Sequence, residues 1–261
     1  MEIITTNNPI ELGKLAGKAA ADLIINTIAQ NGQANIILAT GASQFETLNQ
    51  LISDKRIDWS KVVMFHLDEY IGLPVTAAAS FRKYLKERFL SKVPALKEVY
   101  LIDGEADPEA ECKRLSGLIN QYHIDVALVG IGENGHLAFN DPPADFNTEK
   151  PYIIVELNEL CRKQQLTEGW FDTLDAVPTK AISMSIHQIL KSKYIICSVP
   201  DSRKALAVKN CLENSIDEKY PASILQKHAN CNYYFDKTSV SMLSQKTLAK
   251  IKNKEFSLTG E

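Results

Sequence analysis

Two groups of residues in this sequence are suited to moving protons. Asp68 and Glu69 are adjacent carboxylic acids that follow an apolar run. Neighbouring acids raise each other's proton affinity, so one of them could act as a general base near neutral pH. His136 lies between Glu133 and Asp141, and a histidine near a carboxylate can shuttle protons at neutral pH. The ordinary alternatives are a helix cap or surface turn for the acids and a structural role for the histidine.

Two further groups are suited to binding an anion. One is a turn of small residues before a predicted helix: Thr40, Gly41, Ala42 and Ser43. Free backbone N–H groups and the positive end of a helix together bind phosphate. The other group is Arg203 with Lys204, two cations at a predicted helix start, where they oppose the helix dipole unless an anion offsets the cost. The alternatives are a plain turn capped by Ser43 and two solvated cations.

Glycines are concentrated just before the histidine. The chain has only 12 glycines, and Gly130, Gly132 and Gly135 fall together ahead of His136. Such crowding indicates a close approach between the backbone and a ligand. A lone Gly-x-Gly is a weak signal, but its combination with a histidine after a predicted strand is more specific.

Short apolar runs alternate with helical patterns along the chain. The runs predict buried strands at 36–40, 62–67, 99–103, 126–131, 194–199 and 232–236. Helices are predicted from Pro9, with Asn8 as its N-cap, and at 45–52, 81–90, 108–122 and 205–212. This alternation predicts an α/β fold: a doubly wound, mostly parallel, Rossmann-like sheet with helices on both faces.

The same pattern places the candidate site at one edge of the sheet. The four polar groups each follow a predicted strand, and ligands of open α/β sheets bind beyond the carboxyl ends of the strands. No linker or repeat interrupts the chain, so residues 1–261 are interpreted as one domain. The irregular stretch 141–176, which holds Gly169, Trp170 and Phe171, is expected to form a lid.

Composition excludes several classes of protein. The formal net charge of −3 argues against a nucleic-acid binder, and no apolar run approaches the ~20 residues that span a bilayer. The N-terminus does not resemble a secretory signal. Five cysteines without a CxxC motif argue against a disulfide framework or a zinc site. We therefore expect a cytoplasmic protein with no metal site, no nucleic-acid partner and no membrane partner.

With these groups in place, the sequence resembles the glucosamine-6-phosphate deaminase (isomerase) family, which is related to the 6-phosphogluconolactonases. The resemblance covers nearly the whole chain. It rests on these segments, in order: LATGASQFETL, FHLDEYIGLP, SFRKYL, GIGENGHLAFNDP, VPTKAISMSIHQIL, SRKALAV and SILQKH.

The resemblance implies roles for individual residues. Asp68 matches the carboxylate that abstracts a proton, His136 the ring-opening histidine and Asp141 its acidic assistant. Lys204 matches the phosphate-binding lysine, and the turn at 40–43 matches the phosphate loop. The resemblance also points to Glu69 and Gly135 as further substrate-binding residues. Arg162 and Arg203 are its two candidates for a phosphate-binding arginine in the lid.

The chain departs from the family pattern near the histidine and in the phosphate loop. Asn134 stands where an Asp is typical and cannot hold a charge, although we keep it in the expected catalytic group. Asp141 stands where a Glu is common and is shorter by one methylene. Ala42 replaces a second glycine. These departures indicate a divergent branch, and they leave the preferred epimer of the sugar open.

The resemblance implies that an amino-hexose 6-phosphate becomes a ketohexose 6-phosphate plus ammonia, without a cofactor. Glucosamine 6-phosphate is the first expectation and galactosamine 6-phosphate the alternative. A 6-phosphogluconolactonase is less favoured, because the chain has DEY and GHLAFNDP where lactonases usually carry DER and GHTASLFP. A sensor without activity is less favoured because Asp68 and His136 are both present. The family ranges from monomers to hexamers, so a homo-oligomer is among the expected states.

Overall fold

The computed structural model describes residues 2–253. Its main sheet has the strand order β1-β10-β9-β6-β2-β3-β5, and every neighbouring pair is parallel. The strands of this sheet are β1 (Glu2–Thr6), β2 (Ala34–Leu38), β3 (Val62–His66), β5 (Glu98–Tyr100), β6 (Val126–Val129), β9 (Tyr194–Val199) and β10 (Cys231–Asp236). The predicted mostly parallel α/β sheet is confirmed: six of its strands match predicted runs, with boundaries that differ by at most three residues, and β1 was not predicted.

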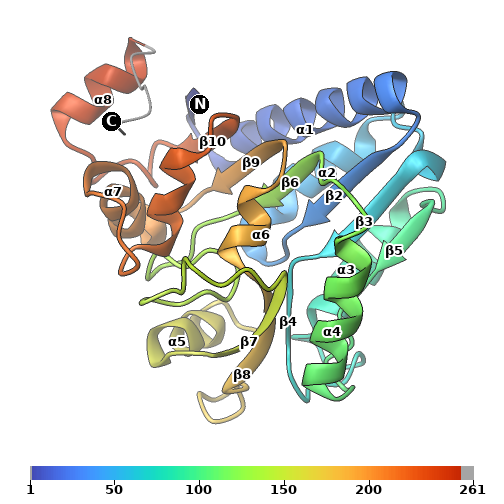
Figure 1. Cartoon of the computed structure of the whole chain (residues 1–261). Helices are drawn as coiled ribbons and strands as arrows, with labels where there is room; N and C mark the ends of the chain where they lie inside the picture. Colours follow the sequence, from blue (N-terminus) through green and yellow to red (C-terminus); the bar gives the residue numbers. More distant parts are fainter. Residues whose placement is uncertain (1, 254–261) are drawn as a thin grey trace.

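Helices cover both faces of this sheet (Figure 1). The helices are α1 (Pro9–Asn31), α2 (Phe45–Ser53), α3 (Phe81–Arg88), α4 (Pro108–Ile119), α5 (Glu159–Thr167), α6 (Ile186–Leu190), α7 (Ala205–Glu213) and α8 (Gln245–Lys252). One apolar cluster packs α1, α2 and α3 against the sheet, and a second packs α4, α6 and α7 against its other face. The strands β3 and β6 are buried at every position, as their continuous apolar runs predict.

The first helix begins where the sequence predicts. Asn8 has an extended backbone, and its side chain accepts a hydrogen bond from the backbone N–H of Glu11. Pro9 occupies the first helical position, where its missing N–H costs nothing. The helix ends at Gly32, whose φ of 76° is the left-handed conformation that glycine adopts readily.

A second, smaller sheet lies beside the carboxyl ends of the main one. It joins β4 (Asp68–Tyr70), β8 (Lys180–Met184) and β7 (Tyr152–Glu156) in antiparallel order. This sheet and α5 occupy the lower part of Figure 1. The sequence did not predict these elements: the stretch 141–176, expected to be irregular, contains both β7 and α5.

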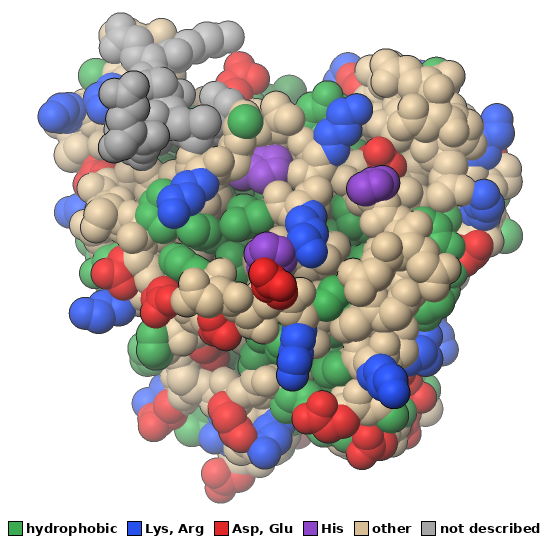
Figure 2. Space-filling view, in the orientation of Figure 1, with side chains coloured by type: hydrophobic (Ala, Val, Ile, Leu, Met, Phe, Trp, Pro, Cys, Tyr) green, Lys and Arg blue, Asp and Glu red, His purple; other side chains and the backbone are tan. Residues whose placement is uncertain are grey.

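The surface carries charges of both signs. Figure 2 shows Lys and Arg side chains interspersed with Asp and Glu side chains over one face of the molecule. Among residues 2–253, the structure contains no helix that is long and apolar enough to cross a membrane.

Candidate active site

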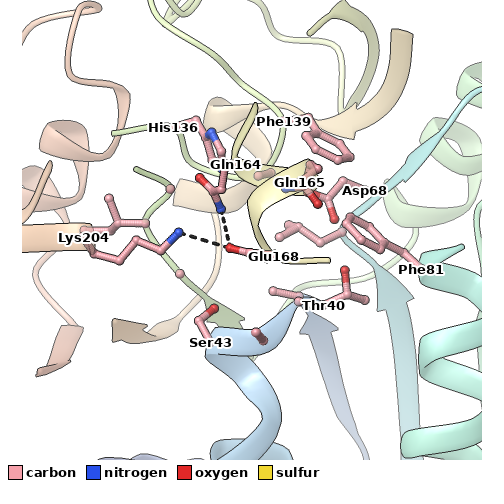
Figure 3. A pocket seen from close by; sticks show the side chains of 18 residues that line it. Thr40, Ser43, Asp68, Phe81, His136, Phe139, Gln164, Gln165, Glu168 and Lys204 are labelled. Atoms are coloured by element: carbon pink, nitrogen blue, oxygen red, sulfur yellow. Dashed lines mark hydrogen bonds and ion pairs between the residues drawn. The ribbon is translucent and has the colours of Figure 1, made fainter. Parts of the chain in front are cut away.

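A pocket lies at the carboxyl ends of the central strands and brings the predicted groups together (Figure 3). Of the predicted site residues, seven line it: Thr40, Gly41, Ala42, Ser43, Asp68, His136 and Lys204. They come from the ends of β2, β3, β6 and β9, which are adjacent in the main sheet. Residues distant in sequence therefore meet, because the carboxyl ends of parallel strands lie at the same edge of the sheet.

The turn after β2 forms one wall of the pocket. Gly41 has a φ of 93°, a conformation that residues with a side chain rarely adopt, and its carbonyl accepts a hydrogen bond from the Tyr84 hydroxyl at 3.2 Å. The Thr40 hydroxyl is buried and has no hydrogen-bond partner in the described part of the chain. A buried hydroxyl without a partner is costly unless a ligand or water satisfies it. The turn is thus suited to receive a polar group.

Lys204 forms the opposite wall. It ends the short 3-10 turn Ser202–Lys204 that leads into α7, and it is only 4% exposed. Its ammonium lies 3.4 Å from a carboxylate oxygen of Glu168 and 3.6 Å from one of Glu133. Arg203, the neighbouring cation, is instead paired with Asp201 at 2.8 Å and Glu133 at 3.5 Å. Of the two cations, only Lys204 lines the pocket.

The loop 130–136 holds the histidine in place. The backbone N–H of Gly132 donates to the carbonyl of His136, and the Asn134 side chain accepts from the backbone N–H of His136. A methyl group on Gly132 would lie 2.1 Å from Nε2 of His136. Gly132 is therefore explained by the imidazole, which packs directly on its backbone, whereas a side chain on Gly130 would approach Ser43 and Gln44. Gly135, with a φ of 86°, provides the turn but does not line the pocket.

Asp141 lies behind the imidazole. Its Oδ1 is 3.2 Å from Nδ1 of His136 and accepts a hydrogen bond from the Asn134 amide at 2.8 Å. Its Oδ2 accepts from the backbone N–H of Asn158. Burial alone would raise the pKa of Asp141, but the hydrogen bonds from His136, Asn134 and Asn158 lower it below its ordinary value. Asp141 therefore stays ionised and favours a proton on Nδ1 of His136, which leaves Nε2 to act as a base.

Asp68 lies where the chain passes from β3 in the main sheet to β4 in the small sheet. It is 6% exposed and lines the pocket, and no side-chain hydrogen bond to its carboxylate is found in the described region. Burial, and to a smaller extent the charge of Glu69, raise the pKa of Asp68 to about 8. A carboxylic acid with such a pKa can hold or release a proton near neutral pH.

The carboxylate of Glu69 is directed away from the pocket. It accepts hydrogen bonds from the Ser80 hydroxyl and from the backbone N–H groups of Phe81 and Arg82 at the start of α3. Alternating side-chain direction along β4 explains why adjacent acids face opposite ways. Glu69 was expected to bind substrate, but in the structure it caps a helix instead.

Arg162 also points elsewhere. Its guanidinium donates to the carbonyls of Leu174 at 2.6 Å and Val177 at 3.2 Å, and it does not line the pocket. These bonds tie α5 to the segment that follows it. The structure therefore gives Arg162 a role in holding the 141–176 segment together, and it places this guanidinium outside the pocket where the phosphate contact was expected.

Comparison with known proteins identifies the family. A model of the glucosamine-6-phosphate isomerases/6-phosphogluconolactonase family matches residues 7–234. The chain belongs to this family. A glucosamine-6-phosphate deaminase of Lactococcus lactis subsp. cremoris is 36% identical over 94% of this chain and 100% of its own. One from Bacillus thuringiensis is 35% identical over 94% of this chain and 90% of its own.

Solved structures agree with this membership of the isomerase/lactonase family. The structure of a monomeric glucosamine-6-phosphate deaminase matches with a TM-score of 0.85 and 33% identity, over 93% of this chain and 100% of that one. A 6-phosphogluconolactonase from Trypanosoma brucei matches with a TM-score of 0.76 and 17% identity, over 93% and 98%. At that identity, the lactonase supports the shared fold alone.

Helix α5 contributes side chains to the site, and the sequence analysis did not predict them. Gln164, Gln165 and Glu168 line the pocket from one side of the helix. A signal was available: Asn158 followed by Glu159 is a typical helix start, and the Asn158 side chain does accept from the backbone N–H of Cys161. The apolar aromatic wall of Phe81 and Phe139 was missed as well.

One cluster of side chains in residues 2–253 has the composition of a metal site. Ligand atoms of His136, Asp141 and Cys161 lie within 4.8 Å of one another. Burial and the nearby Asp141 raise the pKa of the Cys161 thiol well above its ordinary value. Asp141 in this cluster already accepts hydrogen bonds from Asn134 and Asn158, so the cluster is explained as a hydrogen-bonded group that orients the histidine.

Proposed function

We propose that this family member is a glucosamine-6-phosphate deaminase, which converts glucosamine 6-phosphate and water to fructose 6-phosphate and ammonia. The observation that carries the proposal is that Asp68 and His136 share one pocket with the turn 40–43 and Lys204. Deaminases of this name that are 35–36% identical along nearly the whole chain support it.

The phosphate is assigned to the side of the pocket formed by the turn 40–43 and Lys204. The ammonium of Lys204 supplies a charge-assisted contact, while the backbone of the turn and the Thr40 and Ser43 hydroxyls supply hydrogen bonds. Because the phosphate does not react, its binding energy serves to orient the sugar toward Asp68 and His136.

Ring opening is assigned to His136. With a proton on Nδ1 facing Asp141, Nε2 is free to take the proton from the O1 hydroxyl and to return it to the ring oxygen O5 as the C1–O5 bond breaks. Asn134 stands where a family acid is typical, and it contributes a hydrogen bond to Asp141 instead of a charge. Asp141 is then the acid that stabilises the imidazolium formed during this step.

Isomerisation is assigned to Asp68. Its carboxylate removes the proton from C2 of the open-chain sugar, which gives an enolamine, and a proton is delivered to C1. The resulting ketose imine at C2 is hydrolysed by water to the ketone and ammonia. The raised pKa of Asp68 makes it a stronger base than an ordinary carboxylate, which matches the task.

The test is the product formed from four substrates by the purified chain. We expect equal amounts of ammonia and fructose 6-phosphate from glucosamine 6-phosphate, little product from galactosamine 6-phosphate or glucosamine, and no acid from 6-phosphogluconolactone. Preferential turnover of galactosamine 6-phosphate would reassign the epimer. Lactone hydrolysis without ammonia release would replace the proposal with a lactonase, and ligand binding without turnover would replace it with a sensor.

We further propose that the reaction takes place in the cytoplasm. All five cysteines are free and buried, which suits a reducing compartment.

A further inference from the structure

The lysine assigned to the phosphate has a carboxylate partner in the structure. Glu168, at the end of α5, places its Oε1 3.4 Å from the ammonium of Lys204 (Figure 3). The same oxygen accepts a hydrogen bond from the Gln164 amide at 2.9 Å, and Oε2 accepts one from the indole N–H of Trp170 at 3.3 Å. The Glu168 side chain is 8% exposed, so it is held inside the pocket.

The position of this carboxylate is the one expected for the substrate's phosphate. Glu168 lines the same pocket as the turn 40–43, and it lies between that turn and Lys204 in Figure 3. The remaining cavity encloses about 70 Å³, whereas pockets for small ligands enclose about 300–1,000 Å³. The pocket is therefore partly filled by its own side chains.

A phosphate and the Glu168 carboxylate do not fit beside Lys204 together. Both are anions, and repulsion between like charges is stronger in a partly buried site than in water. Glu133, the other carboxylate near Lys204, also lies 3.5 Å from Arg203, so it has a second cation nearby. Among residues 2–253, Lys204 is the cation that forms an ion pair with Glu168, while Arg203 is paired with Asp201 and Glu133. Glu168 is therefore the anion that the phosphate must replace.

We propose that Glu168 is a specificity-determining residue, which occupies the phosphate position until substrate binds and is then exchanged for the phosphate of the incoming sugar. This inference rests on the proposed function, because it takes Lys204 as the phosphate ligand. Release of Glu168 also breaks the contact between the end of α5 and Lys204. A sugar without a phosphate has no group that replaces Glu168.

Glu168→Gln tests this exchange, because it removes the charge and keeps the size of the side chain. The readouts are the inhibition constant of inorganic phosphate, its dissociation constant by calorimetry, and KM for glucosamine 6-phosphate. A charge-assisted contact is roughly twice as strong as a neutral one. The neutral side chain of Glu168→Gln therefore competes less strongly for Lys204, and phosphate should bind about tenfold more tightly to this variant. KM for glucosamine 6-phosphate should also fall, while the affinity for unphosphorylated glucosamine stays unchanged.

Two further variants make the comparison specific. Glu159→Gln removes an exposed carboxylate from the start of the same helix, where it pairs with Lys163, and it should leave phosphate binding unchanged. Glu168→Asp keeps the charge but shortens the side chain by one methylene, so it should bind phosphate more tightly than the native chain. Circular dichroism and thermal unfolding verify that each variant is folded. If Glu168→Gln does not fold, the comparison of Glu168→Asp with the native chain tests the proposal.

Fluorescence reports the exchange directly. The chain has two tryptophans, and the indole of Trp170 contacts Glu168 while Trp59 is buried against Phe89. Phosphate should change the emission of the native chain, and Trp170→Phe should abolish this change.

Unchanged or weaker phosphate binding in Glu168→Gln would overturn the proposal and show that Glu168 is either uninvolved or a substrate ligand. Absence of phosphate binding in every variant would overturn it as well. Failure of the native chain to release ammonia would reject the proposed function, but the calorimetric comparison would still decide the role of Glu168.

Discussion

Replacing Asp68 by Asn should make the protein more stable while lowering its activity by roughly 10²–10⁴. The carboxyl of Asp68 is buried, and burial first, then the charge of Glu69, raises its pKa from 3.8 to about 8. In the unfolded chain this group is ionised above pH 4, whereas in the folded chain it keeps its proton up to about pH 8. Folding at neutral pH must therefore take up a proton, which costs free energy.

The size of the effect follows from proton linkage. A group whose folded pKa is raised adds most stability below its unfolded pKa, and that contribution is lost as the pH rises toward the folded pKa. Each pKa unit corresponds to about 1.4 kcal/mol. The native carboxyl therefore costs about 3 kcal/mol at pH 6 and roughly 5 kcal/mol at pH 8, relative to a group that cannot ionise.

Urea denaturation of the native chain and of Asp68→Asn, at several pH values between 5 and 8, measures this cost. The difference in the free energy of unfolding should grow by about 1.4 kcal/mol for each pH unit, in favour of the variant. Asp175→Asn, at an exposed position, is the matched control and should change stability by less than about 0.5 kcal/mol throughout. A difference between Asp68→Asn and the native chain that does not vary with pH would refute a raised pKa at Asp68.

Three other results are expected. The ratio kcat/KM for glucosamine 6-phosphate should rise with pH toward about 8, because the base must be ionised; a profile already flat from pH 5 upward would contradict this. Lys204→Ala should raise KM roughly 10- to 100-fold with a smaller effect on kcat, as loss of a charge-assisted contact predicts, and an unchanged KM would remove Lys204 from the phosphate site. Gly132→Ala should lower kcat at least about tenfold, because the new methyl would overlap the imidazole of His136. Gly117→Ala is its control, because the methyl added there meets open space. Equal activity of the two variants would show that the imidazole position is not critical.

The central strands of the main sheet could be predicted from the sequence because they are buried on both faces. The edge strand β1 has both exposed and buried residues, and it was not predicted. Continuous apolar runs such as Val62–Leu67 have few alternative explanations, and Asn8 with Pro9 is a clear helix start. The meeting of Asp68, His136, Lys204 and the turn 40–43 could also be predicted, because it depends only on strand order at one edge of a parallel sheet.

The small sheet and α5 could not be predicted, because their stability comes from tertiary contacts. β4 is a strand of three residues whose partner, β8, lies far along the chain. The directions of Glu69 and Arg162 depend on those same contacts, so residue type alone pointed both toward the ligand. Sequence-local patterns contain no information on which side of a three-residue strand faces the pocket.

Comparing ammonia release by the native chain and by Asp68→Asn is the most direct test of the proposed mechanism. Both proteins are assayed with glucosamine 6-phosphate, and ligand binding is measured in parallel by calorimetry. We expect one ammonia for each fructose 6-phosphate in the native chain, and turnover lower by roughly 10²–10⁴ in the variant, with sugar-phosphate binding retained. Ammonia release by Asp68→Asn at the native rate would contradict the assignment of Asp68 as the base.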